Sequence, residues 1–438
     1  MSPIRWRVIR WIFLVAGLLS LTGCWDRRET PELAIVGSIG LDAGDEGRVL
    51  VSLEVIHADA LARGPGPVSV PSKVVAWVFR EEGRTVLNAI RNVETRTSRR
   101  MFVGQVNTVI FGQNLARQGI RRYLDVFERQ SQFRRSLILN VCDTGAGLLQ
   151  RPLIEDIPSR TLSGQANTAL YAGKTVVVTL NEFLRTLAEP GIEPVTSHTA
   201  GRQTRDAMVK RLGESVRQKN PSVMRPQPFT ADEMPEGELP PDSPVLDPLR
   251  EAGTGEEMEG ITVVPGIAVF RGDRLVGFLD GAEARGYLWA AGRIRGAILE
   301  IPSPLPGIEV LALEVIRVQS SIEPQISGQK IRIKVTIGAL LEISEVPVGF
   351  VMSQDTVGRI EEAANEFIRR EVYRTLRRVQ REYKSDIYGF GQAVYRKDPR
   401  LWRRLEDDWN RHIFPHLEVQ VQVRSNIRSS ALLLRDPR

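Results

Sequence analysis

The chain has 438 residues, with 59 lysines and arginines against 53 aspartates and glutamates, a formal net charge of +6, and only two cysteines. Because single hydrophobic cores stop growing near ~250–300 residues, this length predicts more than one domain. An apolar fraction of 42% and a charged fraction of 26% are typical of globular proteins and exclude a collagen-like fibre and a polytopic membrane protein. Two cysteines also exclude a cysteine-rich zinc cluster.

The first 24 residues have the pattern of a bacterial export signal. Arg5, Arg7 and Arg10 form a positive start, and the apolar run 11–21 follows. As a helix this run spans roughly 16 Å, about half of a ~30 Å hydrocarbon core, so it is too short for an ordinary membrane span. A cytosolic protein with an apolar N-terminus is the less favoured alternative.

Residues 21–24, Leu-Thr-Gly-Cys, resemble a lipobox, in which a small residue precedes the cysteine that receives a diacylglyceryl group. We expect cleavage after Gly23 and lipidation of Cys24, so that two or three acyl chains hold the mature protein to a membrane. The second cysteine, Cys142, lies in an apolar run and is predicted to be a buried, inert thiol.

An acidic, proline-rich stretch divides the mature chain. Residues 229–260 contain ten acids and one base, and eight of the 26 prolines lie between Pro221 and Pro248. Proline rings disfavour regular structure, and so polar a segment buries too little apolar area to offset its chain entropy. We predict a linker or insertion over 201–260; an acidic calcium loop, the alternative, would need the DxDxDG spacing.

The region before this stretch, residues 24–200, mixes strand and helix patterns. Thr179 and Glu182 form a capping box for a helix that stops at Glu189-Pro190-Gly191. Strands are predicted at 33–41, 49–56, 106–111, 137–142 and 176–179, and helices at 85–93, 115–127 and 181–188.

The region after it, residues 261–438, begins with a predicted hairpin, 263–270 and 275–279, around Arg271-Gly272-Asp273, which we interpret as a polar turn and not an adhesion motif. Apolar residues at three-to-four spacing predict one long helix over 355–384, and Asp398 followed by Pro399 predicts the start of another. Strands are predicted at 308–318, 330–343 and 417–423, the last of them half-buried and antiparallel.

These patterns predict an α+β fold with mixed or antiparallel sheets flanked by helices. We divide the chain into a signal peptide (1–23), an N-terminal region (24–200), the linker (201–260) and a C-terminal region (261–438).

No catalytic or cofactor-binding motif stands out. The chain has no Walker loop, nucleophile elbow, zinc-protease helix or dinucleotide fingerprint. His412 and His416 are four residues apart, but Pro415 between them disfavours a shared helical face, and Gly389 and Gly391 are interpreted as the end of the long helix. A glycosidase-like carboxylate pair is left open, although only 6% of residues are aromatic. We predict no enzyme, no cofactor and no metal site.

Arginine supplies 51 of the 59 basic residues and recurs in pairs such as Arg121-Arg122, Arg369-Arg370 and Arg403-Arg404. Nucleic-acid binding would use such pairs on phosphates, but an exported, lipid-anchored protein meets anionic headgroups first. We predict no nucleic-acid partner and interpret most arginines as solvated helix faces, with attraction to a membrane surface as a secondary hypothesis.

Two terminal motifs resemble the Ger(x)C family, the lipoprotein C subunits of nutrient germinant receptors in endospore-forming bacteria. One is the run 23–29, Gly-Cys-Trp-Asp-Arg-Arg-Glu, followed by Glu32-Leu33-Ala34. The other is the run 386–391, Asp-Ile-Tyr-Gly-Phe-Gly, with Pro399, Trp402, Trp409 and Phe414-Pro415.

The resemblance implies about three small α+β domains and a non-catalytic protein tethered to the outer face of the spore inner membrane, beside integral-membrane A-type and B-type subunits. It assigns a role only to Cys24, as the lipid site. The C-terminal motif is either a partner surface or a capped turn with a core stripe, and its candidate residues are Asp386, Gly389, Phe390, Trp402 and Trp409.

The alternative function is a lipoprotein that binds a solute for a transporter. Such receptors have two parallel α/β lobes, whereas the alternating strands 330–343 and 417–423 favour sheets solvated on one face. A cell-surface enzyme is the third possibility.

Overall fold

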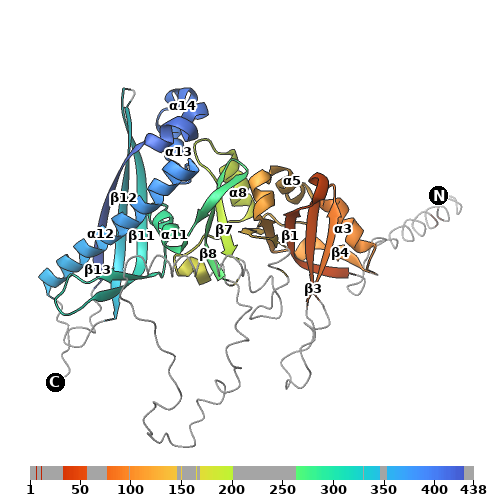
Figure 1. The fold of residues 1–438 in the computed structure, drawn as a ribbon, viewed down its shortest axis with the longest axis horizontal. Coiled ribbons are helices and arrows are strands. Elements are labelled where there is room, and N and C mark those ends of the chain that lie inside the picture. The colour runs from red at the N-terminus through yellow and green to blue at the C-terminus, as the bar shows by residue number, and fades with distance from the viewer. Residues whose placement is uncertain are drawn as a thin grey trace, which may run out of the picture.

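The computed structural model describes residues 33–56, 76–97, 99–145, 168–200, 263–328, 330–345 and 353–428, with the single positions 6, 11, 149 and 164. These residues form an α+β fold of two mixed sheets flanked by helices, as predicted. Figure 1 shows the two sheets following one another along the long axis, with α12 across sheet B and with α3 and α5 at the far end of sheet A. The helices are α3 (Val86–Glu94), α4 (Gln113–Gln118), α5 (Arg121–Arg129), α8 (Leu180–Ala188), α11 (Gly281–Ala290), α12 (Gln354–Arg378), α13 (Phe390–Lys397) and α14 (Pro399–Leu405).

Sheet A has nine strands within the described residues, in the order β3-β2-β1-β5-β6-β7-β8-β9, with β4 paired to the start of β1. Its centre, β1-β5-β6-β7, is parallel and both of its flanks are antiparallel. The strands are β1 (Leu33–Ala43), β2 (Val49–Ile56), β3 (Ala76–Gly83), β4 (Arg100–Phe102), β5 (Thr108–Gly112), β6 (Ile138–Cys142), β7 (Val195–Ala200), β8 (Val263–Arg271) and β9 (Arg274–Leu279).

The central strands of sheet A are buried on both faces. Every residue of β5 is buried, which is typical of a parallel strand covered by helices. α5 contributes the apolar stripe Tyr123, Leu124 and Phe127 to this core. The predicted C-terminal region does not start a new sheet, because β8 pairs with β7 and its hairpin with β9 completes sheet A. The predicted linker, 201–260, lies outside the described residues, and the domain division stays a prediction.

Sheet B has the order β10-β11-β12-β13 among the described residues. Burial alternates along β12, so one face packs on the core and the other is more exposed. α12 covers the packed face with Ile360, Ala364, Ile368, Val372 and Leu376, which follow the predicted helical spacing. The strands are β10 (Ile298–Pro302), β11 (Val310–Ser327), β12 (Lys330–Glu345) and β13 (Glu418–Arg428).

The direction of β13 corrects the prediction of an antiparallel strand, because β13 runs parallel to β12. The alternation of apolar and polar residues identified a half-buried strand but carries no information on its direction. Direction follows from the connection, since α12, α13 and α14 lie between the two strands and return the chain to the end at which β12 began.

Side chains of α12 cover the outer edge of β13. The Tyr373 hydroxyl accepts a hydrogen bond from the Val421 N–H at 3.1 Å, and the Asn365 carbonyl oxygen accepts one from the Ser425 N–H at 2.7 Å. Glu361 accepts from the Ile427 N–H at 2.9 Å. Unpaired edge groups attract other strands, so these bonds protect sheet B from edge-to-edge pairing.

Several local predictions are confirmed. Thr179 and Glu182 form the capping box of α8, Asp398 caps α14 with Pro399 in its first turn, and Arg271-Gly272-Asp273 makes the turn between β8 and β9. The range 355–384 predicted for the long helix is confirmed to within one residue, but Gly389 and Gly391 do not end it, because Gly389 caps the start of α13 and Gly391 lies in the first turn of α13. A π-helical turn at 379–383 extends α12, and the chain leaves it at Lys384, which has a left-handed φ of 47°.

Candidate functional site

The predicted lipid site, Gly23 and Cys24, lies outside the described residues. The first residue of β1, Leu33, follows Cys24 by nine positions. Among the described residues, no helix is both long enough and apolar enough to cross a membrane.

The other predicted site residues surround a buried carboxylate, that of Asp386. It accepts hydrogen bonds from the backbone N–H groups of Gly389 at 3.0 Å, Phe390 at 3.1 Å and Gly391 at 2.7 Å, and from the Trp409 indole N–H at 2.8 Å. Complete burial raises the pKa of Asp386 to about 6, although these four donors act in the opposite direction. Asp386 thus fixes both the turn 386–391 and the indole ring of Trp409.

Two glycines allow the chain to pack closely at this turn. Gly389 has a left-handed φ of 75°, which L-residues with a Cβ rarely adopt. A Cβ on Gly191 would lie 2.3 Å from the carbonyl carbon of Gly391, so only glycine permits this approach between the segment after α8 and the first turn of α13. The Gln392 N–H donates to the Gly191 carbonyl at 2.8 Å across the same contact.

A second carboxylate, Glu193, connects the Asp386 turn to sheet A. Asn410 donates from its side-chain nitrogen to Glu193, and its side-chain oxygen accepts the Asp386 N–H at 3.1 Å. Glu193 also accepts the N–H of Gly272, in the β8–β9 turn, while its own N–H donates to the Asp386 carbonyl at 2.9 Å. Burial raises the pKa of Glu193 to about 7. We call Glu193, Asp386, Trp409 and Asn410 the carboxylate joint.

The structure brings the predicted site residues together inside the protein. Asp386, Phe390, Trp402 and Trp409 are at most 3% exposed, and the rings of Trp402 and Trp409 lie 5.2 Å apart. Their side chains therefore contact other parts of this chain, as in the capped-turn interpretation. Sequence reasoning missed Glu193 and Asn410; the only signal for Glu193 was its place in a Pro-Gly-rich segment after α8.

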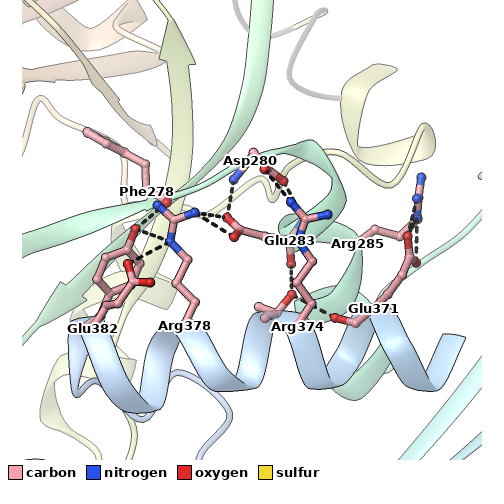
Figure 2. Close-up of polar contacts among 10 residues, drawn as sticks. Phe278, Asp280, Glu283, Arg285, Glu371, Arg374, Arg378 and Glu382 are labelled. Atoms are coloured by element: carbon pink, nitrogen blue, oxygen red, sulfur yellow. Dashed lines mark hydrogen bonds and ion pairs between the residues drawn. The ribbon is translucent and has the colours of Figure 1, made fainter. Parts of the chain in front are cut away.

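A row of ion pairs links α11 to α12 (Figure 2). Glu283, which is buried, accepts two hydrogen bonds from Arg378 at 2.7 and 2.9 Å, and Glu371 accepts from Arg285 at 2.9 Å. Figure 2 shows Glu283 and Arg285 on α11 facing Arg378, Arg374 and Glu371 on α12. The Tyr383 hydroxyl, just beyond α12, donates to the Phe278 carbonyl of β9 at 2.7 Å.

Together, the carboxylate joint and the ion-pair row fasten the C-terminal helices to the last hairpin of sheet A. Within the described residues, no group of three His, Cys, Asp or Glu side chains is close enough to hold a metal ion. The role that this arrangement supports is structural, because buried hydrogen bonds and ion pairs hold sheet A and α12 in one arrangement.

Comparison with known proteins identifies the relatives of this chain. A model described as "Spore germination protein N-terminal domain" matches residues 26–199, and one described as "Spore germination B3/ GerAC like, C-terminal" matches residues 265–431. The chain is 24% identical to spore germination protein KC of Bacillus subtilis (strain 168) over 430 residues, which cover 96% of this chain and 95% of that protein. It is 21% identical to spore germination protein B3 of the same organism, with 93% of each chain covered.

Among solved structures, the crystal structure of the GerBC protein matches with a TM-score of 0.52 and 14% identity, covering 89% of this chain and 97% of that one. This likeness supports the α+β fold. The names of the matched proteins describe germination proteins and no enzyme, in agreement with the prediction of a non-catalytic chain.

Proposed function

Because the chain belongs to the Ger(x)C family of spore germination proteins, we propose that it is a lipid-anchored, non-catalytic subunit of a nutrient germinant receptor. It acts in assembly or signal relay beside integral-membrane A-type and B-type subunits, on the outer face of the spore inner membrane. The observation that carries the proposal is the match of two germination-protein domain models along most of the chain.

The lipid anchor is supported by the sequence around Cys24. A basic start, a short apolar run and the small residue Gly23 precede this cysteine, and Leu33 in sheet A follows it after nine positions. Two or three acyl chains hold a protein to a bilayer durably. The alternative, a solute receptor of a transporter, has less support because the described strands form one nine-stranded and one four-stranded sheet and not two similar lobes.

A relay role is supported by the contacts that join sheet A to the helices of the C-terminal region. The carboxylate joint and the ion-pair row connect sheet A to α12 through buried groups, so a displacement at one end of the molecule meets a stiff connection to the other. We regard this stiffness as the physical basis for transmitting a movement of a membrane partner.

The test is Cys24→Ala in a sporulating host. We expect loss of metabolic acyl labelling, loss of membrane retention in spore fractions and impaired germination with nutrients, scored separately for amino acids and sugars. The matched control is Cys142→Ala, which alters the buried cysteine of β6 and should keep labelling and retention. Normal labelling and retention of the Cys24 variant would contradict the anchor; normal nutrient germination without this chain would contradict the receptor role.

A further inference from the structure

A groove of about 540 Å³ lies between α3 and α5. Figure 1 shows these two helices on the side of the molecule opposite to α13 and α14. The start of α3 forms one wall and the length of α5 forms the other. Its lining residues are Arg84, Thr85, Val86, Leu87, Arg122, Tyr123, Asp125, Val126, Arg129 and Gln130.

The groove combines an apolar interior with a cationic rim. Leu87 is 37% exposed, and the half-buried Val126 lines the same groove. Three arginines against one aspartate leave an excess of two positive charges on the lining. The Arg122 guanidinium lies 4.6 Å from the centre of the Tyr123 ring, which holds it at the rim.

Two of these arginines lack an ion-pair partner among the described residues. Arg129 pairs with Asp125 at 2.7 Å, but within the described part of the chain neither Arg84 nor Arg122 has a carboxylate oxygen within 4.0 Å. Arg374 and Arg378 of α12 differ, because they pair with carboxylates of the α11 segment.

The groove is also close in the chain to the predicted lipid site. An adjoining smaller hollow shares Leu87 and Gln130 with the groove and is lined as well by Leu33, the first residue of β1. Leu33 follows Cys24 by nine positions, and a fully extended chain of that length spans roughly 30 Å at most. An acyl chain on Cys24 therefore keeps the bilayer within about that distance of Leu33.

We propose that the α3–α5 groove faces the membrane and binds the headgroup of an anionic phospholipid. Arg84 and Arg122 contact the phosphate, and Leu87 contacts the boundary between headgroups and acyl chains. Arginine beside an exposed leucine is the composition that interfacial membrane contacts use. The proposal deepens the proposed function and rests on its lipid anchor for the choice of a bilayer over a protein partner.

The first test measures vesicle binding by the full mature chain carrying Cys24→Ala, so that no acyl chain contributes. We expect binding to phosphatidylglycerol-containing vesicles that weakens as salt rises, and little binding to phosphatidylcholine vesicles. Arg84→Glu with Arg122→Glu should lower the partition coefficient at least about ten-fold, because two attractive charges become repulsive. The matched control, Arg403→Glu with Arg404→Glu on α14, makes the same charge change at the other end and should have little effect.

The second test uses the lipidated chain with a single labelled position. Leu87→Cys and Tyr395→Cys replace side chains of equal exposure, 37% and 38%, one in the groove and one on α13. In vesicles with brominated anionic lipids, we expect a fluorophore at position 87 to be quenched and one at position 395 to stay bright.

Equal losses for the two arginine pairs, salt-independent binding or equal quenching at both positions would overturn the proposal. Quenching at position 87 that needs the integral-membrane subunits would also overturn it, because the groove would then bind protein. The anchor is judged separately by acyl labelling of Cys24. Vesicle binding without acyl labelling of Cys24 would support the headgroup site in the groove but not the lipid anchor. Acyl labelling without vesicle binding would refute the headgroup site and leave the lipid anchor standing.

Discussion

The carboxylate joint and the α3–α5 groove are two charged regions of one molecule that differ in where their charges find partners. In the joint, Asp386 is fully buried and accepts four hydrogen bonds from N–H groups of the same chain. In the groove, the charges of Arg84 and Arg122 face solvent. Because burial without a partner is costly, charges in the joint should determine stability, whereas charges in the groove should affect binding and leave stability almost unchanged.

The largest expected effect is that of Asp386→Ala. It leaves four buried N–H donors without an acceptor and opens a cavity beside Trp409, so we expect the free energy of unfolding to fall by about 4 kcal/mol. Urea denaturation followed by tryptophan fluorescence, to which Trp402 and Trp409 contribute, measures this change. Asp386→Asn should cost less, because its side-chain oxygen still accepts. A loss below about 1 kcal/mol for the alanine variant would show that the joint does not stabilise the fold.

The next largest effect is expected for Glu283→Ala, which should lower the free energy of unfolding by about 3 kcal/mol. It removes the bidentate partner of Arg378 and the capping box that Glu283 forms with Asp280 at the start of α11. Glu382→Ala is the matched control, because Glu382 lies 3.5 Å from the same arginine but is 64% exposed. The control should change the free energy of unfolding by less than about 0.5 kcal/mol. Equal effects of the two variants would remove the distinction between buried and exposed partners.

A smaller effect is expected in the pH dependence of stability, through Glu193. Burial raises its pKa to about 7, with Asp386 nearby acting in the same direction and Arg271 opposing it. The folded state therefore holds a proton that the unfolded state releases near pH 4.5, so this contribution is present below pH 4.5 and is lost as pH rises to 7.

Glu193→Gln should remove that loss, which we expect to be about 2 kcal/mol between pH 4.5 and 7.5. The measurement is the free energy of unfolding at several pH values for both proteins. Asp386, whose pKa is also raised, should leave a weaker slope of the same sign in the variant. An unchanged pH dependence would mean that Glu193 is not the group that titrates.

Local patterns were predictable from the sequence, because their physics lies within a few residues. The capping box of Thr179 and Glu182, the cap of α14 at Asp398 and the stripe of α12 each depend on contacts three or four positions apart. The hydrogen bonds that Asp386 accepts within the turn 386–391 are also local, because their backbone donors lie within five residues of Asp386.

Contacts distant in sequence were not predictable. Glu193 meets Asn410 across 217 positions, and no pattern near either residue indicates the other. The direction of β13 and the completion of sheet A by β8 and β9 also depend on how the connections run in space. The burial of Trp402 and Trp409 was foreseen as one of two interpretations, because helical spacing alone does not tell whether an apolar face meets its own chain or a partner.

The smallest expected change in stability is that of the double variant Arg84→Glu with Arg122→Glu. This variant tests most directly whether charges in the groove and charges in the joint have different roles. Both side chains are exposed and neither pairs with a carboxylate of the described chain, so no partner is left buried and unsatisfied. We expect the free energy of unfolding to change by less than about 0.5 kcal/mol, within the range of surface substitutions. A variant that unfolds as the parent does but no longer binds anionic vesicles would separate the two roles of charge. If the free energy of unfolding changed by several kcal/mol, the two arginines would stabilise the fold as the joint does, and the loss of vesicle binding would reflect unfolding and not a lost headgroup contact.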